Sequence, residues 1–213
     1  FYDFFRSVSE TPEQLIITPN DYRLRIEASE AQLLNLDYSP ATWSDLLEIQ
    51  GGLLTDTSLL KINTSDDLDN EVAMIVGGVK EHPFDPSKLI WNIAADTLPS
   101  NTLPSIDRIV NPDDAAPDDG LPSAQIGQRY LITSDTPWSG SDYWGINNVK
   151  ANANDIIEYS AQGEWIISFN SSESPQTQVL TNNYTNKQLK WDGEKWFSSY
   201  EGVYNGGFWR LFP

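Results

Sequence analysis

The alternation of apolar and polar residues is clearest in the last sixty residues, where one short motif occurs three times. Each copy has an aromatic residue, then a polar turn that contains glycine, then a tryptophan that opens a new run of alternating residues. The copies occupy residues 159–169, 191–200 and 204–212. Asp192-Gly193 and Asn205-Gly206 are dipeptides that accept the positive φ of a tight turn. The motif therefore predicts three β-hairpins, and we expect each to bury one tryptophan, namely Trp165, Trp196 and Trp209.

The segments around these hairpins show the same periodicity of two. Residues 128–132 and 178–180 are short apolar runs typical of strands, and residues 154–159 lead into the first hairpin. We therefore expect the second half of the chain to be an all-β unit.

The first half of the chain shows signals for helix starts and stops instead. Residues 39–51 are the clearest case, with Ser39 before Pro40, apolar residues at helical spacing, and Gly51 just past the end. A further start lies at residues 11–13. Similar patterns predict helices over residues 28–36, 65–77 and 85–95. We expect three or four short helices in a small, mainly helical unit.

A change in composition separates the two halves. Residues 111–122 hold four aspartates, no basic residue and two interior prolines, which favours an extended, solvated linker. Six of the eight tryptophans follow residue 123. The predicted fold class is thus α+β, with a mainly helical docking domain at 1–110, a linker at 111–122, and an all-β hairpin-repeat domain at 123–213.

The net charge narrows the classes of partner. The chain carries 31 acidic and 13 basic residues, for a formal charge of −18. Such a surface repels nucleic acid and anionic membranes, and it favours a partner that carries basic residues. There is no cysteine, so disulfides and thiolate metal sites are excluded. No apolar run is long enough for a membrane helix. Because the chain begins at Phe1 rather than Met, we expect a processed product or part of a longer protein.

Catalytic residues are not evident. His82 is the only histidine and has no nucleophile motif beside it. The aspartates at 113, 114, 118 and 119 lack the spacing of a calcium loop, so no metal or other cofactor is predicted. A polysaccharide hydrolase stays an alternative to the non-enzymatic interpretation, because two carboxylates need only approach each other in space. The carboxylates considered are Asp155, Glu158, Glu164, Asp192, Glu194 and Glu201.

Aromatic residues are the stronger candidates for binding. Trp138, Tyr143 and Trp144 lie in a segment rich in small residues, where exposed rings would stack on sugars. The first five residues are strongly aromatic and would form a sticky patch if exposed. We therefore name as assembly contacts Phe1, Tyr2, Phe4 and Phe5.

Residues 121–200 resemble a known protein module. The resemblance rests on Pro122, Gly127 and Tyr130 in one motif, on the Tyr159–Trp165 hairpin, and on Leu189 to Trp196 in the next. Similar motifs occur in a largely uncharacterised β module of virion and tail-associated proteins of tailed bacteriophages. The chain departs from that pattern in a long insert over residues 133–154. The resemblance implies a structural role and a place in the virion, and it brings no catalytic residue.

Two functions follow as hypotheses. The first is a structural component of a phage virion, in the tail, neck, baseplate or fibre attachment. It would act by protein–protein assembly, as a homo-oligomer or with other virion subunits. The second is a glycan-binding module that contacts a host surface through the loop aromatics.

Overall fold

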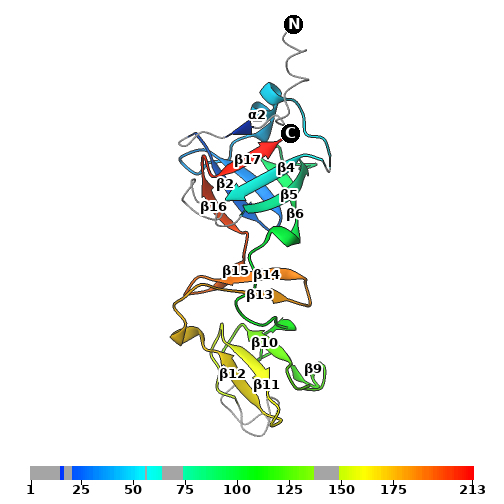
Figure 1. The fold of residues 1–213 in the computed structure, drawn as a ribbon, viewed down its shortest axis with the longest axis vertical. Helices are drawn as coiled ribbons and strands as arrows, with labels where there is room; N and C mark the ends of the chain where they lie inside the picture. Colours follow the sequence, from blue (N-terminus) through cyan, green and yellow to red (C-terminus); the bar gives the residue numbers. More distant parts are fainter. Residues whose placement is uncertain (1–14, 17–20, 56, 64–73, 137–148) are drawn as a thin grey trace. The chain divides into compact units, whose positions relative to one another are not determined.

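The computed structural model of the chain describes residues 15–16, 21–55, 57–63, 74–136 and 149–213. The chain forms two units (Figure 1). The first combines residues 1–99 with residues 200–213, and the second comprises residues 100–199. The second unit is therefore an insertion in the first, and the chain passes between the units twice. The expected boundary at 111–122 does not coincide with either passage.

The first unit is built on one eight-stranded sheet with the order β1-β17-β4-β5-β6-β3-β2-β16. All neighbouring strands in it are antiparallel. Its strands are β1 (Leu15–Ile16), β2 (Arg23–Glu27), β3 (Glu30–Leu34), β4 (Leu59–Asn63), β5 (Met74–Glu81), β6 (Lys88–Ile93), β16 (Gly202–Asn205) and β17 (Trp209–Phe212). Figure 1 shows the sheet curling around its own core. The predicted helical N-terminal unit is therefore wrong, and the protein is all-β apart from short helical segments.

The segment expected as a helix over residues 28–36 belongs to a β-hairpin. Strands β2 and β3 are joined by Ala28 and Ser29, whose φ angles are 47° and 71°. Positive φ at both central residues makes the turn that suits the twist of two antiparallel strands. Alanine and serine rarely adopt this conformation, so the sequence did not signal a turn here.

One predicted helix is confirmed. Helix α2 (Trp43–Gln50) starts later than Ser39, with Thr42 as its N-cap, and it ends at Gly51. Gly51 has φ of 97° and donates its N–H to the carbonyl of Leu47 at 2.7 Å. The glycine stop signal was therefore correct, because only a residue without Cβ takes this conformation at low cost. Within the described residues, the other helical segments are 3-10 turns: η1 (Ala95–Thr97) and η3 (Ser171–Glu173).

The helix predicted over residues 85–95 is strand β6 with the turn before it. The Asp85 carboxylate accepts hydrogen bonds from the Ser87 amide at 3.0 Å and the Ser87 hydroxyl at 2.7 Å. An aspartate at a helix N-cap makes the same kind of bond, which explains the error. Residues 74–77 of the predicted helix at 65–77 belong to strand β5. The rest of that helix, and the start at 11–13, lie outside the described residues.

The third copy of the aromatic motif is not a paired hairpin. Strand β16 pairs with β2, whereas β17 pairs with β4 and β1. In the sheet order β17 is second and β16 is last, yet only residues 206–208 separate them along the chain. That connection therefore crosses from one end of the curled sheet toward the other. Its Phe208 carbonyl accepts from the amide of Asn63 at 2.9 Å.

The curled sheet encloses a core. Side chains alternate along each strand, so that every second one points into this core. Trp43 and Trp209 meet edge to face with ring centroids 5.6 Å apart, and Trp91 meets Tyr200 at 6.3 Å. The buried residues of this core are Leu24, Ile26, Ala31, Leu33, Trp43, Leu47, Leu60, Ile62, Ile75, Val79, Leu89, Trp91, Tyr200, Trp209 and Leu211.

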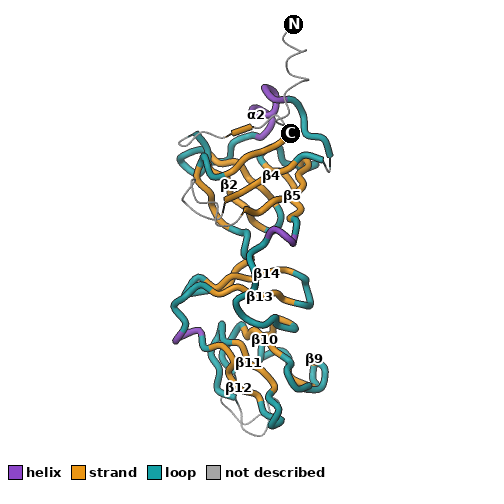
Figure 2. Tube along the Cα trace, viewed as in Figure 1, coloured by secondary structure: helices purple, strands orange, loops and turns teal. Residues whose placement is uncertain are grey.

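The second unit contains three small sheets, seen as separate groups of strands in Figure 2. The four-stranded sheet has the order β12-β11-β10-β7, the next β13-β14-β15, and the smallest β8-β9. The bounds are β7 (Arg108–Val110), β8 (Ala116–Pro117), β9 (Gly120–Leu121), β10 (Arg129–Ile132), β11 (Ile156–Tyr159), β12 (Trp165–Phe169), β13 (Gln178–Asn182), β14 (Lys187–Trp191) and β15 (Trp196–Ser198). The strands predicted near residues 128–132, 154–159 and 178–180 are thus confirmed.

The segment expected to be a solvated linker lies inside this unit. Residues 111–122 include β8 and β9, and Ala116 and Leu121 are buried in a core cluster with Tyr130 and Trp165. Burial of these two apolar side chains anchors the segment, although four aspartates lie close to them in the sequence.

The first two copies of the aromatic motif are hairpins, as predicted. Tyr159 pairs with Trp165 across β11 and β12, and Trp191 pairs with Trp196 across β14 and β15. Trp165 and Trp209 are buried, as expected. Trp196 is only half-buried, and its Nε1 donates to the carbonyl of Asn154 at 3.0 Å.

The two ends of the second unit meet at one side chain. Gln188 Nε2 donates to Asn101 Oδ1 at 3.1 Å, and Gln188 Oε1 accepts from the Ser199 hydroxyl at 2.9 Å. The chain therefore enters and leaves this unit at the same place, as expected for an inserted domain.

Candidate functional site

The binding residues named from the sequence lie outside the described residues. This holds for the glycan candidates Trp138, Tyr143 and Trp144, and for the assembly candidates Phe1, Tyr2, Phe4 and Phe5. Both assignments stay predictions.

Hydrogen bonds join the described residues on the two sides of the segment that contains the glycan candidates. The Thr136 hydroxyl donates to the carbonyl of Val149 at 2.6 Å and accepts from the amide of Ala151 at 3.0 Å. The Thr136 amide also donates to the carbonyl of Ala151 at 2.9 Å. Thr136 is thus hydrogen-bonded to both Val149 and Ala151.

The carboxylates considered for hydrolysis mostly hold the structure together. Asp155 is fully buried and accepts from the Ser171 amide, the Ser171 hydroxyl and the Asn152 amide at 2.7–2.8 Å. Glu158 binds Arg129 at 2.7 Å. The Asp155 bonds fix the connections next to β11 and β12, and the Glu158–Arg129 pair joins β11 to β10, so both groups have a structural use.

Two more of these carboxylates bind backbone amides. Asp192 accepts from the amides of Glu194 and Lys195, both at 2.9 Å, and these bonds lower its pKa. Glu201 accepts from the amide of Ala28 at 3.3 Å. Turn geometry therefore accounts for their positions. In the described part of the chain, no three acidic or histidine side chains gather as a metal site would require. No helix there has the length and apolarity of a membrane span.

His82 stands at the turn between β5 and β6 and contacts two groups. Its Nδ1 accepts from the amide of Phe84 at 3.3 Å, and its Nε2 lies 3.6 Å from Glu30 Oε1. The imidazole therefore helps to shape the turn through an amide and a carboxylate.

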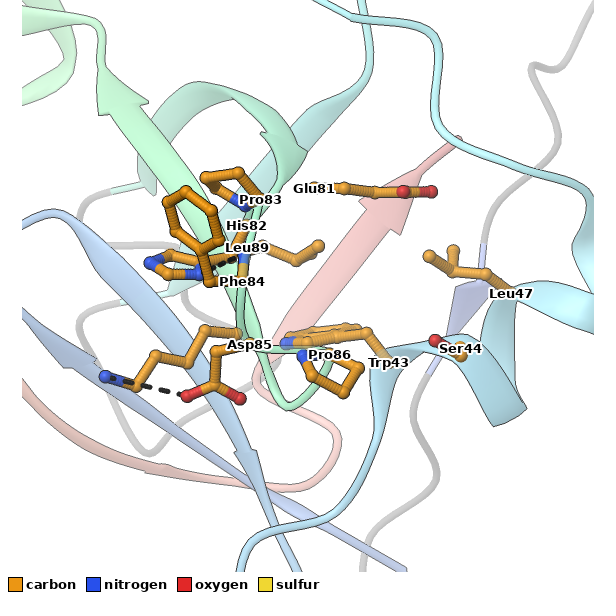
Figure 3. A pocket seen from close by; sticks show the side chains of 11 residues that line it. Trp43, Ser44, Leu47, Glu81, His82, Pro83, Phe84, Asp85, Pro86 and Leu89 are labelled. Carbon is orange, nitrogen blue, oxygen red and sulfur yellow. Dashed lines mark hydrogen bonds and ion pairs between the residues drawn. The ribbon is translucent and has the colours of Figure 1, made fainter.

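A pocket lies beside this turn, and Figure 3 shows its lining. The pocket has a volume of about 280 Å³. Its buried lining comprises Trp43 and Leu47 from α2 and Leu89 from β6, while Glu81 stands at its exposed side. The remaining lining residues are Ser44, His82, Pro83, Phe84, Asp85, Pro86 and Lys88.

Phe84 is the most exposed large apolar residue of the described chain, with 91% of its surface accessible. It lies between Pro83 and the Asp85-Pro86 pair, and each proline fixes a φ angle near −65°. The Asp85–Ser87 bonds close the turn on one side, and the Trp43 amide donates to the Pro86 carbonyl at 3.0 Å on the other. The turn therefore presents the phenyl ring to solvent from a backbone held at several points.

The charged side chains around the pocket differ in whether they have a hydrogen-bond or ion-pair partner among the described residues. Lys88 Nζ lies 2.5 Å from Glu30 Oε2, and this hydrogen bond raises the pKa of Lys88. The hydroxyl and amide of Ser87 lower the pKa of Asp85, which stays ionised at neutral pH. Among the described residues, no hydrogen bond or ion pair engages the Glu81 carboxylate.

The residue order Pro83-Phe84-Asp85-Pro86 is the feature of the sequence that indicates this exposed turn. An aromatic residue between two prolines on a turn is unlikely to be core, since the turn faces water. The helix predicted over residues 85–95 hides this turn, because Asp85-Pro86 also fits the start of a helix.

Comparison of the chain with protein-family models, curated proteins and solved structures found no match. The function must therefore be inferred from the geometry and the sequence motifs.

Proposed function

We propose that the protein is a structural component that acts by assembling with other protein subunits. The observation that carries this proposal is Phe84, an exposed aromatic ring on a turn that prolines and hydrogen bonds fix. Aromatic rings are frequent anchors of protein interfaces. A ring that is already held in position loses little conformational freedom on binding, so more of its burial contributes to affinity.

The charge of the chain supports a protein partner of a particular kind. Residues 1–99 with 200–213 carry a net charge of −11, and residues 100–199 carry −7. Both units therefore repel acidic surfaces and attract basic ones, which raises the association rate with a basic partner.

The sequence motifs of residues 121–200 bear on where the protein acts. Their resemblance to a β module of tailed-phage virion proteins supports a place in the phage particle. The tail, neck, baseplate and fibre attachment all remain within this proposal.

The direct test is the protein content of particles purified from cells that carry the gene. We expect quantitative mass spectrometry to find several copies of the chain per particle after density-gradient purification. If the chain stays with the soluble proteins and is absent from the particles, the proposal fails.

The role of Phe84 can be tested in the same particles. We expect p-benzoylphenylalanine in place of Phe84 to cross-link to a particle subunit on illumination. The matched control places it at Tyr184, a ring with 67% exposure in the second unit that already stacks with Arg108 at 4.1 Å. Cross-linking that is equal at both positions would argue against Phe84 as the anchor.

Glycan binding is the second candidate function, and the hydrogen bonds that join Thr136 to Val149 and Ala151, on either side of the candidate residues in the sequence, favour it. Loops held at their ends on a rigid scaffold often carry binding residues. A glycan array should give a specific signal that Trp138→Ala or Trp144→Ala removes. An array without signal for the purified wild-type chain would remove this candidate.

A further inference from the structure

The backbone of the Phe84 turn is held in part by the imidazole of His82. The amide of Phe84 donates to His82 Nδ1 at 3.3 Å, and Figure 3 draws this bond as a dashed line. The two rings also meet edge to face, with their centroids 6.4 Å apart. Nδ1 accepts a hydrogen bond only while it carries no proton. The hold on the Phe84 amide therefore depends on the protonation state of one side chain.

The other ring nitrogen of His82 faces a carboxylate. Nε2 lies 3.6 Å from Glu30 Oε1, and the imidazole side chain is 19% exposed. Because Nδ1 accepts, Nε2 carries the hydrogen of the neutral ring and directs it toward Glu30. Turning the ring over would move Nε2 away from this carboxylate. The ring therefore keeps its orientation when a second proton arrives, and that proton goes to Nδ1.

Protonation at Nδ1 breaks one contact of the imidazole and strengthens the other. The new N–H faces the N–H of Phe84, and two donors cannot form a hydrogen bond with each other. At the same time the ring becomes a cation beside Glu30, which favours their pairing. A protonated His82 therefore stays with Glu30 and releases the amide of Phe84.

The charged groups around His82 come from three elements. Glu30 belongs to β3, Lys88 to β6, and Glu81 and Asp85 lie beside His82 at the β5–β6 turn. The bonds of Ser87 lower the pKa of Asp85, and the Glu30 carboxylate raises the pKa of Lys88, so both stay charged near neutral pH. Histidine is the side chain that ordinarily changes charge between pH 5 and 8.

We propose that His82 is a pH-sensitive switch for the Phe84 anchor. The neutral imidazole holds the turn that presents the phenyl ring, and the imidazolium releases it. This proposal rests on the assembly role argued above, and it names how that role is regulated. A released turn has to be ordered again on binding, which lowers the affinity for the partner. We expect assembly through Phe84 to weaken about two- to tenfold on acidification, as for one lost hydrogen bond.

The first test is an NMR titration of the full chain between pH 8 and pH 5. His82 is the only histidine, so its ring signal is identified without ambiguity. We expect the imidazole Cε1–H signal and the backbone amide of Phe84 to change with one midpoint. The amide proton should move upfield as its hydrogen bond is lost. A Phe84 amide that does not follow the imidazole would overturn the proposal.

Two substitutions of His82 separate the acceptor from the charge. His82→Asn provides an acceptor that does not titrate, because asparagine side chains bond backbone amides two residues on. The Phe84 amide should then stay constant from pH 8 to pH 5. His82→Phe keeps an aromatic ring but removes the acceptor, so the amide should be unbonded throughout this range. If the amide of His82→Asn changes as in the wild type, another group is responsible and the switch is refuted.

The particle experiment links the switch to assembly. We would measure cross-linking by p-benzoylphenylalanine at position 84 in particles held at pH 7.5 and pH 5.5, with the probe at position 184 as the control for the photochemistry. The yield at position 84 should fall at least twofold at pH 5.5, and His82→Asn should abolish this fall.

The outcomes separate this inference from the assembly role. If the Phe84 amide follows the imidazole but cross-linking is equal at both pH values, the switch fails and the assembly role stands. If the position-84 probe captures no subunit at either pH, the assembly role through Phe84 fails. The NMR titration then decides by itself whether His82 governs the turn.

Discussion

At the scale of single residues, Gly77 shows how closely the core of the first unit is packed. A Cβ on Gly77 would lie 2.0 Å from Nε1 of Trp91 and 2.6 Å from the carbonyl oxygen of Asn92. The indole is buried, so neither it nor the backbone has room to move. The missing side chain at position 77 is what lets Trp91 fill the space between the strands.

We therefore expect Gly77→Ala to lower the free energy of unfolding by about 3 kcal/mol, as overpacked cores do. Urea unfolding followed by circular dichroism would measure the loss. The neighbouring Gly78 provides the control, since a Cβ there meets no atom within 4 Å. Gly78→Ala should be neutral or slightly stabilising. Equal losses for both variants would show that the contact with Trp91 is not the cause.

At the scale of secondary-structure elements, the sequence predicts a hairpin where its turn residues are of types that usually adopt a turn conformation. Asp192-Gly193 announces a turn by its composition, and the hairpin there was predicted correctly. Ala28 and Ser29 adopt positive φ without any such signal, and the prediction of a helix over residues 28–36, which include β3, is therefore wrong. Asp85 fits either a capped helix or a capped turn, because both use the same side-chain bond to a backbone amide.

The turn at Asp85 also gives a prediction about pH. The Ser87 hydroxyl and amide lower the pKa of Asp85, so the folded state favours the ionised carboxylate. This stabilising effect is present above the unfolded pKa of about 3.9 and is lost as the pH falls through the folded value. Ser87→Ala removes the hydroxyl, and we expect the pKa of Asp85 to rise toward its ordinary value.

An NMR titration of the Asp85 carboxyl carbon would measure that change. The stability difference between the wild type and Ser87→Ala should be present at pH 7 and shrink on acidification below pH 4. Ser44→Ala, which removes an exposed hydroxyl from α2 instead, serves as the control. An unchanged Asp85 titration in Ser87→Ala would contradict the assigned cause.

At the scale of the whole molecule, the sequence indicated two units but not their connection. Composition changes near residue 111, yet the structural passages lie after Pro99 and after Ser199. An insertion has no local signature, because the strands that complete the first sheet are recognised only by their partners. The pocket was missed for a related reason: α2 and the β5–β6 turn are far apart in sequence and meet only in the fold.

Because the second unit is inserted in the first, we expect the two parts of the chain to differ in their ability to fold alone. Residues 100–199 have their own core clusters, and their ends meet at Gln188. We expect this fragment to fold alone and to unfold cooperatively on heating. Residues 1–99 lack Trp209, Leu211 and Tyr200 of their core, so they should stay largely unfolded alone. A folded 1–99 fragment beside an unfolded 100–199 fragment would reverse this expectation.

The same topology sets an order of events during synthesis on the ribosome. The inserted unit emerges complete before strands β16 and β17 have been translated. The first unit, although it begins earlier in the chain, must wait for residues 200–213 to close its sheet. The part that starts first therefore folds last, and until then the nascent chain exposes the apolar faces of β2 to β6. Those faces are the surface that a chaperone at the ribosome exit would have to cover.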